Sequence, residues 1–287
     1  MNGMAIERHG GGKRALVGVL VCVTAVWVAA PAYAHQVWVE TASGPRAGQP
    51  HKVEVCWGHA GSREGGSALA KQQDKLTVYV VGPGGRQPLP VTTSSDSFTA
   101  QFTPQAAGCH VLGAELQVGI IDRELHGIPA NTRIVMCGKA CARVDGNSVV
   151  PAAPLGFDLE LVPVSNLHDA KPGDAVTVKV LHRGKPLGGR NVLVSLNTAG
   201  PLPHSEASGI GTREWSIEST ADPSSGEVTF PLIVGGQHLF LVKFIDETAG
   251  TYEGDRNDRS DFSHLCQGDK FERTMHVSTL TFQVPSR

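Results

Sequence analysis

Residues 175–181 read Ala-Val-Thr-Val-Lys-Val-Leu, and this stretch carries the pattern on which the fold depends. Its three valines alternate with small or polar residues, so an extended chain here has one apolar face and one polar face. Turn residues flank the stretch on both sides, at 171–174 (Lys-Pro-Gly-Asp) and 183–186 (Arg-Gly-Lys-Pro). The sequence therefore predicts a half-buried β-strand between two turns.

Short alternating segments separated by turn residues recur along the chain from residue 35 onward. We predict further strands over His35–Glu40, Lys52–Trp57, Leu76–Val81, Ser97–Phe102, Cys109–Leu116, Arg133–Val144, Phe157–Val164, Asn191–Leu196, His238–Phe244 and Ser278–Val284. The sequence contains no amphipathic helical stretch of convincing length. Regularly spaced short strands are typical of sandwiches, so we predict an all-β fold of two Ig-like β-sandwich domains in tandem.

The strongest signal for a domain boundary lies where the alternation stops. Residues 145–147 read Asp-Gly-Asn and are followed by Pro151 and Pro154, a composition typical of linkers. We therefore predict an N-terminal β-sandwich domain over residues 35–150 and a C-terminal Ig-like β-sandwich domain over residues 151–287. Each part is long enough to bury a core of its own.

Residues 1–34 have the features of a secretory signal peptide. A basic end at residues 13–14 precedes an apolar run at residues 15–30, and the small residues Ala32 and Ala34 supply a cleavage signal. The run is too short, and too closely followed by the cleavage signal, to remain as a membrane span. We expect a soluble protein exported to the periplasm, with His35 as its first residue; cleavage after Ala32 is the alternative.

Composition argues against nucleic acid as a partner and does not settle how the cysteines are paired. The net charge is −2 and there is no long basic block, which argues against nucleic-acid binding. Five cysteines follow the leader, at positions 56, 109, 137, 141 and 266. An odd number leaves at least one thiol free, paired between chains or bound to a metal, and the pairing stays open. The absence of G-x-S-x-G and H-E-x-x-H motifs gives hydrolase functions no support.

Several motifs together resemble one protein family. They are residues 159–166 (Leu-Glu-Leu-Val-Pro-Val-Ser-Asn), 171–174, 184–187 (Gly-Lys-Pro-Leu), 191–192 (Asn-Val) and 278–282 (Ser-Thr-Leu-Thr-Phe), with an Ala-His start after the leader and a Gly58-His59 pair. This set resembles the periplasmic family 4198 of domains of unknown function, often labelled a nickel/cobalt uptake periplasmic component. Related nickel-uptake proteins bind the metal through their mature N-terminus and a further histidine, which implies a role for His35 and His59. The chain departs from the usual pattern in its cysteines and in Cys109-His110, which leaves the identity of the metal open.

The chemistry of the histidines points to the same residues. A terminal His35 offers an amine and an imidazole nitrogen that can close a chelate ring on one metal, and the amine titrates near neutrality, so a metal displaces its proton easily. His59 follows a strand end and a glycine, and is either a third nitrogen ligand or a loop histidine. His110 and His126 are candidate further ligands, or residues of a strand face and a loop. Nitrogen ligands suit Cu(II) and Ni(II), so the expected cofactor is a divalent transition metal: nickel, cobalt or copper.

We expect a periplasmic metal-binding protein that serves metal uptake or handling without catalysis, with components of a membrane metal transporter as partners. Two alternatives stay open. One is a copper-dependent oxidative enzyme built on the N-terminal histidine chelate, which peroxide consumption by the copper-loaded protein would favour. The other is an Ig-like structural or adhesion module, which failure to retain any transition metal on dialysis would favour.

Overall fold

The computed structural model describes residues 35–42, 44–59, 62–125, 127–146, 153–199 and 215–285. Most of these residues belong to β-strands, which confirms the predicted all-β fold. The described ranges also contain a short α-helix, α1 (Gly66–Ala70), and a 3₁₀ helix, η1 (Gln73–Lys75). Within these ranges we find no helix with the length and apolar character needed to span a membrane. The predicted leader and its cleavage site lie outside the described residues.

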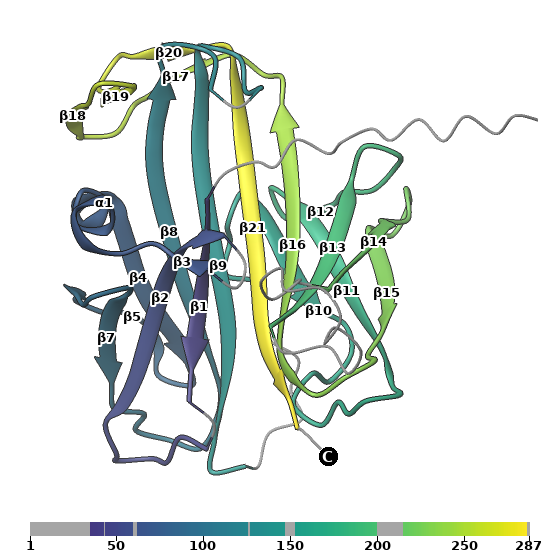
Figure 1. Cartoon of the computed structure of the whole chain (residues 1–287). Coiled ribbons are helices and arrows are strands. Elements are labelled where there is room, and N and C mark those ends of the chain that lie inside the picture. The colour runs from purple at the N-terminus through teal and green to yellow at the C-terminus, as the bar shows by residue number, and fades with distance from the viewer. Residues whose placement is uncertain are drawn as a thin grey trace, which may run out of the picture. The chain divides into compact units, whose positions relative to one another are not determined.

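A ten-stranded sheet contains strands from both halves of the chain (Figure 1). Its strands follow the order β14 (Trp215–Thr220), β13 (Leu193–Ala199), β16 (Gly236–Asp246), β21 (Arg273–Val284), β9 (Thr132–Val144), β8 (Gly108–Ile121), β19 (Ser263–Cys266) and β18 (Asn257–Arg259), and β8 also pairs with β4 (Leu76–Gly82), which pairs with β5 (Gly85–Pro88). β21 runs parallel to β9 and antiparallel to β16, between which it lies in Figure 1. We call this sheet the central sheet.

Two smaller sheets cover the central sheet. The first cover sheet contains β1 (Gln36–Thr41), β2 (His51–His59), β7 (Phe98–Phe102), β6 (Thr92–Thr93) and β3 (Ser62–Arg63). The second contains β10 (Leu159–Pro163), β11 (Ala175–His182), β12 (Lys185–Pro186) and β15 (Glu227–Pro231). A separate short pair is formed by β17 (Gly250–Thr251) and β20 (Lys270–Phe271). The predicted strand at 175–181 is β11, with its turns on either side as expected.

Neighbouring residues of β9 show that the cover sheets lie on opposite faces of the central sheet. Gly138 lies under β1, because a Cβ atom built at this position would come within 3.0 Å of the Cα of Trp38. The next residue, Lys139, points the other way, and its Nζ lies 2.6 Å from Oε1 of Glu160 in β10. β9 is therefore buried between both cover sheets, and glycine at position 138 permits the close approach of β1.

Each cover sheet encloses a hydrophobic core against the central sheet. The first core gathers side chains from β1, β2, β7, β4, β8 and β9, and the second gathers them from β10, β11, β15, β13 and β16. β21 contributes to both cores, with Met275 and Val277 in the first and Leu280 and Val284 in the second. The central sheet is thus shared by the two halves, and the domain division near residue 150 stays a prediction.

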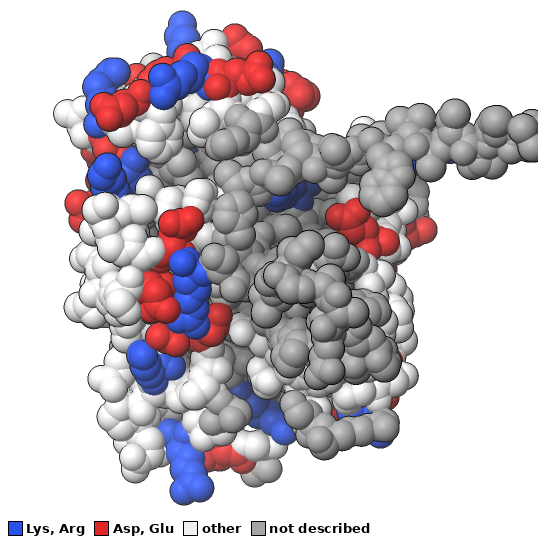
Figure 2. Space-filling model, in the orientation of Figure 1, with Lys and Arg blue, Asp and Glu red and all other residues white. Residues whose placement is uncertain are grey.

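Charged side chains on the face shown in Figure 2 are interspersed by sign. Basic and acidic groups alternate at the end of the molecule that carries β17, β18 and β20, and again beside β1 and β2. The described residues visible on this face therefore form no broad area of one charge, which agrees with a net charge close to zero.

Candidate metal sites

The register of β1 and β2 brings the two leading candidate ligands together. Gln36 of β1 pairs with Gly58 of β2, so the next position outward sets His35 opposite His59. Residues directly opposite each other in an antiparallel pair have Cβ atoms about 4.5–5.5 Å apart. The side chain of His59 lies outside the described residues, and its backbone pairs with that of Ser62 in β3.

The side chain of His35 is held from two sides. Its ring stacks on the indole of Trp57, with the ring centroids 4.2 Å apart and the planes inclined by 18°. Its Nε2 lies 3.2 Å from Oε1 of Glu64, just beyond β3. The imidazole is 28% exposed, so it is anchored and still open to solvent. A carboxylate on Nε2 is the usual partner of a metal-binding histidine, because it fixes the tautomer and raises the basicity of the other nitrogen.

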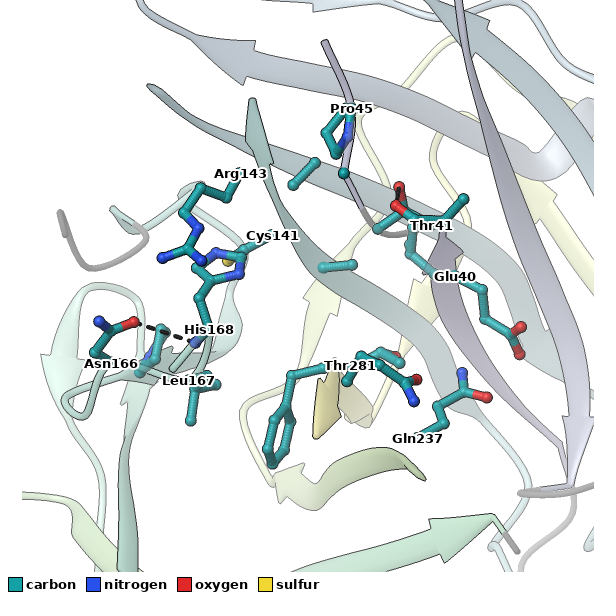
Figure 3. Close-up of a pocket in the computed structure, with 18 of the residues that line it drawn as sticks. Glu40, Thr41, Pro45, Cys141, Arg143, Asn166, Leu167, His168, Gln237 and Thr281 are labelled. Carbon is teal, nitrogen blue, oxygen red and sulfur yellow. Dashed lines mark hydrogen bonds between the residues drawn. The ribbon is translucent and has the colours of Figure 1, made fainter. Parts of the chain in front are cut away.

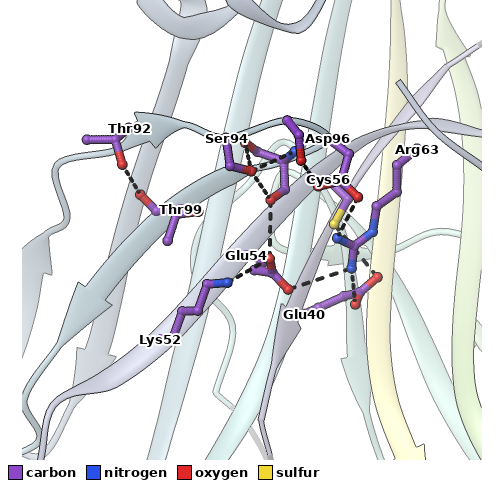
Figure 4. Close-up of polar contacts among 11 residues, drawn as sticks. Glu40, Lys52, Glu54, Cys56, Arg63, Thr92, Ser94, Asp96 and Thr99 are labelled. Atoms are coloured by element: carbon purple, nitrogen blue, oxygen red, sulfur yellow. Dashed lines mark hydrogen bonds and ion pairs between the residues drawn. The ribbon is translucent and has the colours of Figure 1, made fainter. Parts of the chain in front are cut away.

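A charged network on the first cover sheet fixes the segment that carries Glu64 (Figure 4). Nη2 of Arg63 in β3 lies 2.6 Å from Oε2 of Glu40 and 3.7 Å from Oε2 of Glu54. Oε1 of Glu40 accepts hydrogen bonds from the indole N–H of Trp38 at 2.6 Å and from the thiol of Cys56 at 3.7 Å. These contacts tie β3 to β1 and β2, directly beside the position of Glu64 in the chain.

Cys56 in this network is a protonated, inert thiol and not a ligand. Burial raises the pKa of Cys56 strongly, and the neighbouring carboxylate of Glu40 raises the pKa further. A thiol must lose its proton to bind a metal, so a high pKa opposes that role. None of the five cysteines in the described part of the chain forms a disulfide.

The structure does not bring His110 next to His35. His110 lies near the start of β8, at the end of the sheet that adjoins the last residues of β1, whereas His35 precedes the first residue of β1. Its ring is buried, stands 5.8 Å from the Phe102 ring, and has Nδ1 3.4 Å from the carbonyl oxygen of Gly108. His126 lies outside the described residues.

Two groups of metal-binding residue types that the sequence did not reveal also converge. Among the described residues, Cys109, Cys141 and His168 form one group, and His182, Asp246 and His276 form another. Within each group the possible ligand atoms all lie within 4.8 Å of one another. We call the first the thiol cluster and the second the imidazole cluster.

The thiol cluster polarises one of its sulfurs. A hydrogen bond from Cys141 lowers the pKa of Cys109 to about 5, against the effect of burial and with help from the His168 imidazole. The same hydrogen bond, together with burial, raises the pKa of Cys141 well above its usual range. Cys109 is therefore the thiolate of the pair near neutral pH.

In the imidazole cluster the carboxylate of Asp246 is already paired with the guanidinium of Arg183. Nη2 of Arg183 lies 2.8 Å from Oδ2 of Asp246, and Nε2 of His182 lies 3.6 Å from the same oxygen. Oδ1 of Asp246 accepts a hydrogen bond from the backbone N–H of Thr248 at 3.0 Å. Burial lowers the pKa of His276 to about 4, so this imidazole is neutral at physiological pH.

Comparison with known proteins gives one family match. The model of the family described as "Domain of unknown function (DUF4198)" matches residues 32–246, which is more than half of the chain. No curated protein sequence matches significantly. Among solved structures, the chain is similar to "Bacteroides ovatus mixed-linkage glucan utilization locus (MLGUL) SGBP-B in complex with mixed-linkage heptasaccharide", at 11% identity and a TM-score of 0.16. The match covers 86% of this chain and 60% of that chain, and at this TM-score it carries no argument.

Proposed function

This chain belongs to the DUF4198 family, and we propose that it is an exported, non-catalytic protein of the periplasm that binds nickel, cobalt or copper. The proposed ligands are the terminal amine and imidazole of His35 and the imidazole of His59. In this role the protein serves uptake or handling of the metal and meets components of a membrane metal transporter.

The observation that carries the proposal is the register of β1 and β2. Two histidines separated by a long stretch of sequence occupy opposite positions at one end of a strand pair, because Gln36 pairs with Gly58. Cleavage of the leader after Ala34 would add a free amine at this same end. Three nitrogens from two neighbouring backbone positions are enough to begin a square-planar site of the kind that Cu(II) and Ni(II) prefer.

The contact between His35 and Glu64 supports a particular mode of binding. With its proton on Nε2, the imidazole donates to the Glu64 carboxylate 3.2 Å away, and Nδ1 is then the basic nitrogen. Nδ1 is also the ring nitrogen that can close a small chelate ring with the amine of the same residue. Stacking on Trp57 holds the ring in one orientation, which reduces the entropy lost when the metal binds.

The test compares the mature protein beginning at His35 with a form that carries one extra alanine in front of it. The extension leaves the His35 side chain and β1 unchanged but moves the terminal amine out of the chelate. We expect calorimetric titration with Ni²⁺ and Cu²⁺ to show a loss of affinity above about 100-fold, since even partners outside the ligand set contribute about 10–100-fold. His59→Ala should lose affinity on the same scale, and Glu64→Gln about tenfold.

His110→Gln is the matched control, because His110 lies at the other end of the sheet. It should bind as the unchanged protein does, with circular dichroism confirming that each variant is folded. Equal affinity of the alanine-extended and native termini would exclude the amine as a ligand and overturn the proposal. Consumption of peroxide by the copper-loaded protein would favour the oxidative enzyme instead.

A further inference from the structure

We propose that the thiol cluster, Cys109, Cys141 and His168, binds one Cu(I) ion at a site separate from His35 and His59. The inference does not depend on the proposed function of the N-terminal histidines. It rests on the convergence of three soft or borderline ligand atoms, on the surroundings of His168 and on a pocket that leads to them.

The antiparallel pairing of β8 and β9 sets the two sulfurs side by side. Cys109 pairs with Arg143, and Val111 pairs with Cys141, so the cysteines occupy diagonal positions on one face of the central sheet. Such diagonal neighbours are within reach of each other's side chains. Here the two sulfurs lie within 4.8 Å of each other and of a nitrogen of His168. The sheet therefore fixes two ligands before any metal arrives.

His168 is brought to the sulfurs by a loop tied to β9. Nη1 of Arg143 donates to Oδ1 of Asp169 at 2.9 Å, and Nδ2 of Asn166 donates to Oδ2 of the same carboxylate at 2.7 Å. Oδ1 of Asn166 accepts the backbone N–H of His168 at 3.1 Å. These contacts place the histidine on a constrained loop anchored two residues from Cys141.

By distance and angle, the buried ring nitrogen Nε2 of His168 makes no hydrogen bond within the described part of the chain, and the imidazole is close enough to the Cys109 sulfur to lower its pKa. Leaving a buried polar atom unpaired costs about 1–3 kcal/mol. A metal ion held with the two sulfurs would satisfy this nitrogen without any change in the fold.

A pocket of about 520 Å³ reaches two of the three side chains of the cluster. Cys141 and His168 line it together with Arg143, Thr41 and Pro45. Figure 3 shows the side chains of Cys141 and His168 next to each other on one wall, with Arg143 above them. Two of the three proposed ligands therefore line this cavity, and Cys109 lies within 4.8 Å of both, so an ion can approach the cluster from the cavity side.

The donor set selects the metal. Thiolate sulfur is a soft ligand that favours Cu(I) and zinc over nickel or cobalt. Zinc is almost always tetrahedral, so three protein ligands leave a fourth position that zinc must fill with water, and the described residues supply three here. Cu(I) accepts three-coordinate sulfur and nitrogen sites, so the geometry points to Cu(I).

The experiment titrates the reduced, full mature chain with Cu(I) under anaerobic conditions, against a chromogenic Cu(I) chelator of known affinity. We expect one equivalent bound with a near-ultraviolet thiolate-to-copper band. Cys109→Ser and His168→Gln should each weaken binding by more than about 100-fold, above the effect of a residue outside the ligand set. Because His168 lies on a loop, its variant tests the site even if a cysteine variant fails to fold.

Cys266→Ser is the matched control, since this thiol lies elsewhere and donates to Oδ1 of Asn257 at 3.2 Å. It should keep full affinity and the same absorption band, and so should His59→Ala. The inference is overturned if the reduced protein does not compete with the chelator, or if His168→Gln binds as tightly as the control. A Cys109–Cys141 disulfide that persists in protein incubated with Cu(I) and reductant would overturn it as well.

Discussion

The thiol cluster and the imidazole cluster each bring three metal-binding side chains together, yet their surroundings differ. In both, the ligand atoms lie within 4.8 Å of one another. The thiol cluster opens on a pocket. The imidazole cluster has the guanidinium of Arg183 2.8 Å from its only carboxylate. A positive group therefore already occupies the place where a metal would be most strongly attracted.

The difference teaches that proximity of ligand atoms is a weak criterion for a metal site. Two unit charges of the same sign about 4 Å apart repel by about 4 kcal/mol at an effective dielectric constant of about 20. A divalent ion in the imidazole cluster would meet this repulsion from Arg183, which is paired with the cluster's own carboxylate. The cation beside the thiol cluster, Arg143, is paired instead with Asp169, which is not one of the proposed ligands. We expect the imidazole cluster to act in stability and the thiol cluster in binding.

The largest expected effect concerns the buried ion pair that joins β9 to β10. Nζ of Lys139 lies 2.6 Å from Oε1 of Glu160, both side chains are 2% exposed, and Glu160 also accepts the backbone N–H groups of Leu155 and Gly156. Glu160→Gln leaves the lysine charge buried and unpaired, and should lower the free energy of unfolding by about 3–5 kcal/mol. Urea unfolding with circular dichroism measures this loss.

Glu227→Gln is the control for that measurement, because it removes one partner of a solvent-exposed pair. The side chains of Lys179 and Glu227 are 32% and 39% exposed, and pairs of this kind contribute about 0–1 kcal/mol. Equal losses in the two variants would mean that the buried pair does not hold β9 to β10.

The next effect is the response of the imidazole cluster to acid. Burial lowers the pKa of His276 to about 4, against the opposing charges of Asp158 and Asp246 and with help from His182 and Arg133. Between this pKa and the unfolded value of about 6.5 the unfolded chain binds more protons, so stability rises with pH. We expect unfolding in urea at pH 4.5 to need less denaturant than at pH 7, with His276 contributing at most about 3 kcal/mol.

His276→Gln sharpens this result, since glutamine keeps a polar side chain but does not titrate. Its stability should change less between the two pH values than that of the unchanged protein. Part of the response should persist, because burial also lowers the pKa of His51 and of His238. A variant with the full original response would show that His276 does not titrate in this window.

The smallest effect would turn the imidazole cluster into a metal site. Arg183 has a left-handed backbone conformation with φ of 49°, which asparagine tolerates better than most residues, so Arg183→Asn removes the cation with little strain. In a background of His35→Ala and Cys109→Ser, which removes the two other candidate sites, zinc affinity measured by calorimetry should rise about tenfold, or about 1.4 kcal/mol. Lys185→Gln removes a nearby exposed charge and should change nothing. If zinc affinity does not rise in Arg183→Asn, the cation is not what separates the two clusters.

Sequence periodicity was sufficient for the fold class and for most strands. The predicted strands at 76–81 and 175–181 match β4 (Leu76–Gly82) and β11 (Ala175–His182) closely, because each has one apolar face. The parallel pairing of β21 with β9 could not be predicted, since period-two alternation says which face is buried and not which strand lies alongside. The sequence therefore suggested two sandwiches and could not indicate the sheet that they share.

Of the candidate sites, the pair of His35 and His59 could be predicted from the sequence and the thiol cluster could not. His35 and His59 stood out through the leader and the glycine, and adjacent strands then set them opposite each other. The thiol cluster was missed because His168 lies in a loop far along the chain, and loop position has no periodic signal. The sequence could have predicted only that Cys109 and Cys141 lie close together, because each lies on a predicted strand and the two strands follow one another in the chain.

The place of β21 also bears on how the protein is made. As the chain is synthesised, β9 is complete long before Arg273–Val284 emerges. One edge of β9 therefore stays unpaired until β21 has been made. An unpaired edge of a buried, apolar strand is a template for association with other chains. A nascent chain that stalls before β21 would therefore expose this edge together with the parts of both cores that β21 covers. Holding such chains extended until the last strand arrives is a task suited to a chaperone.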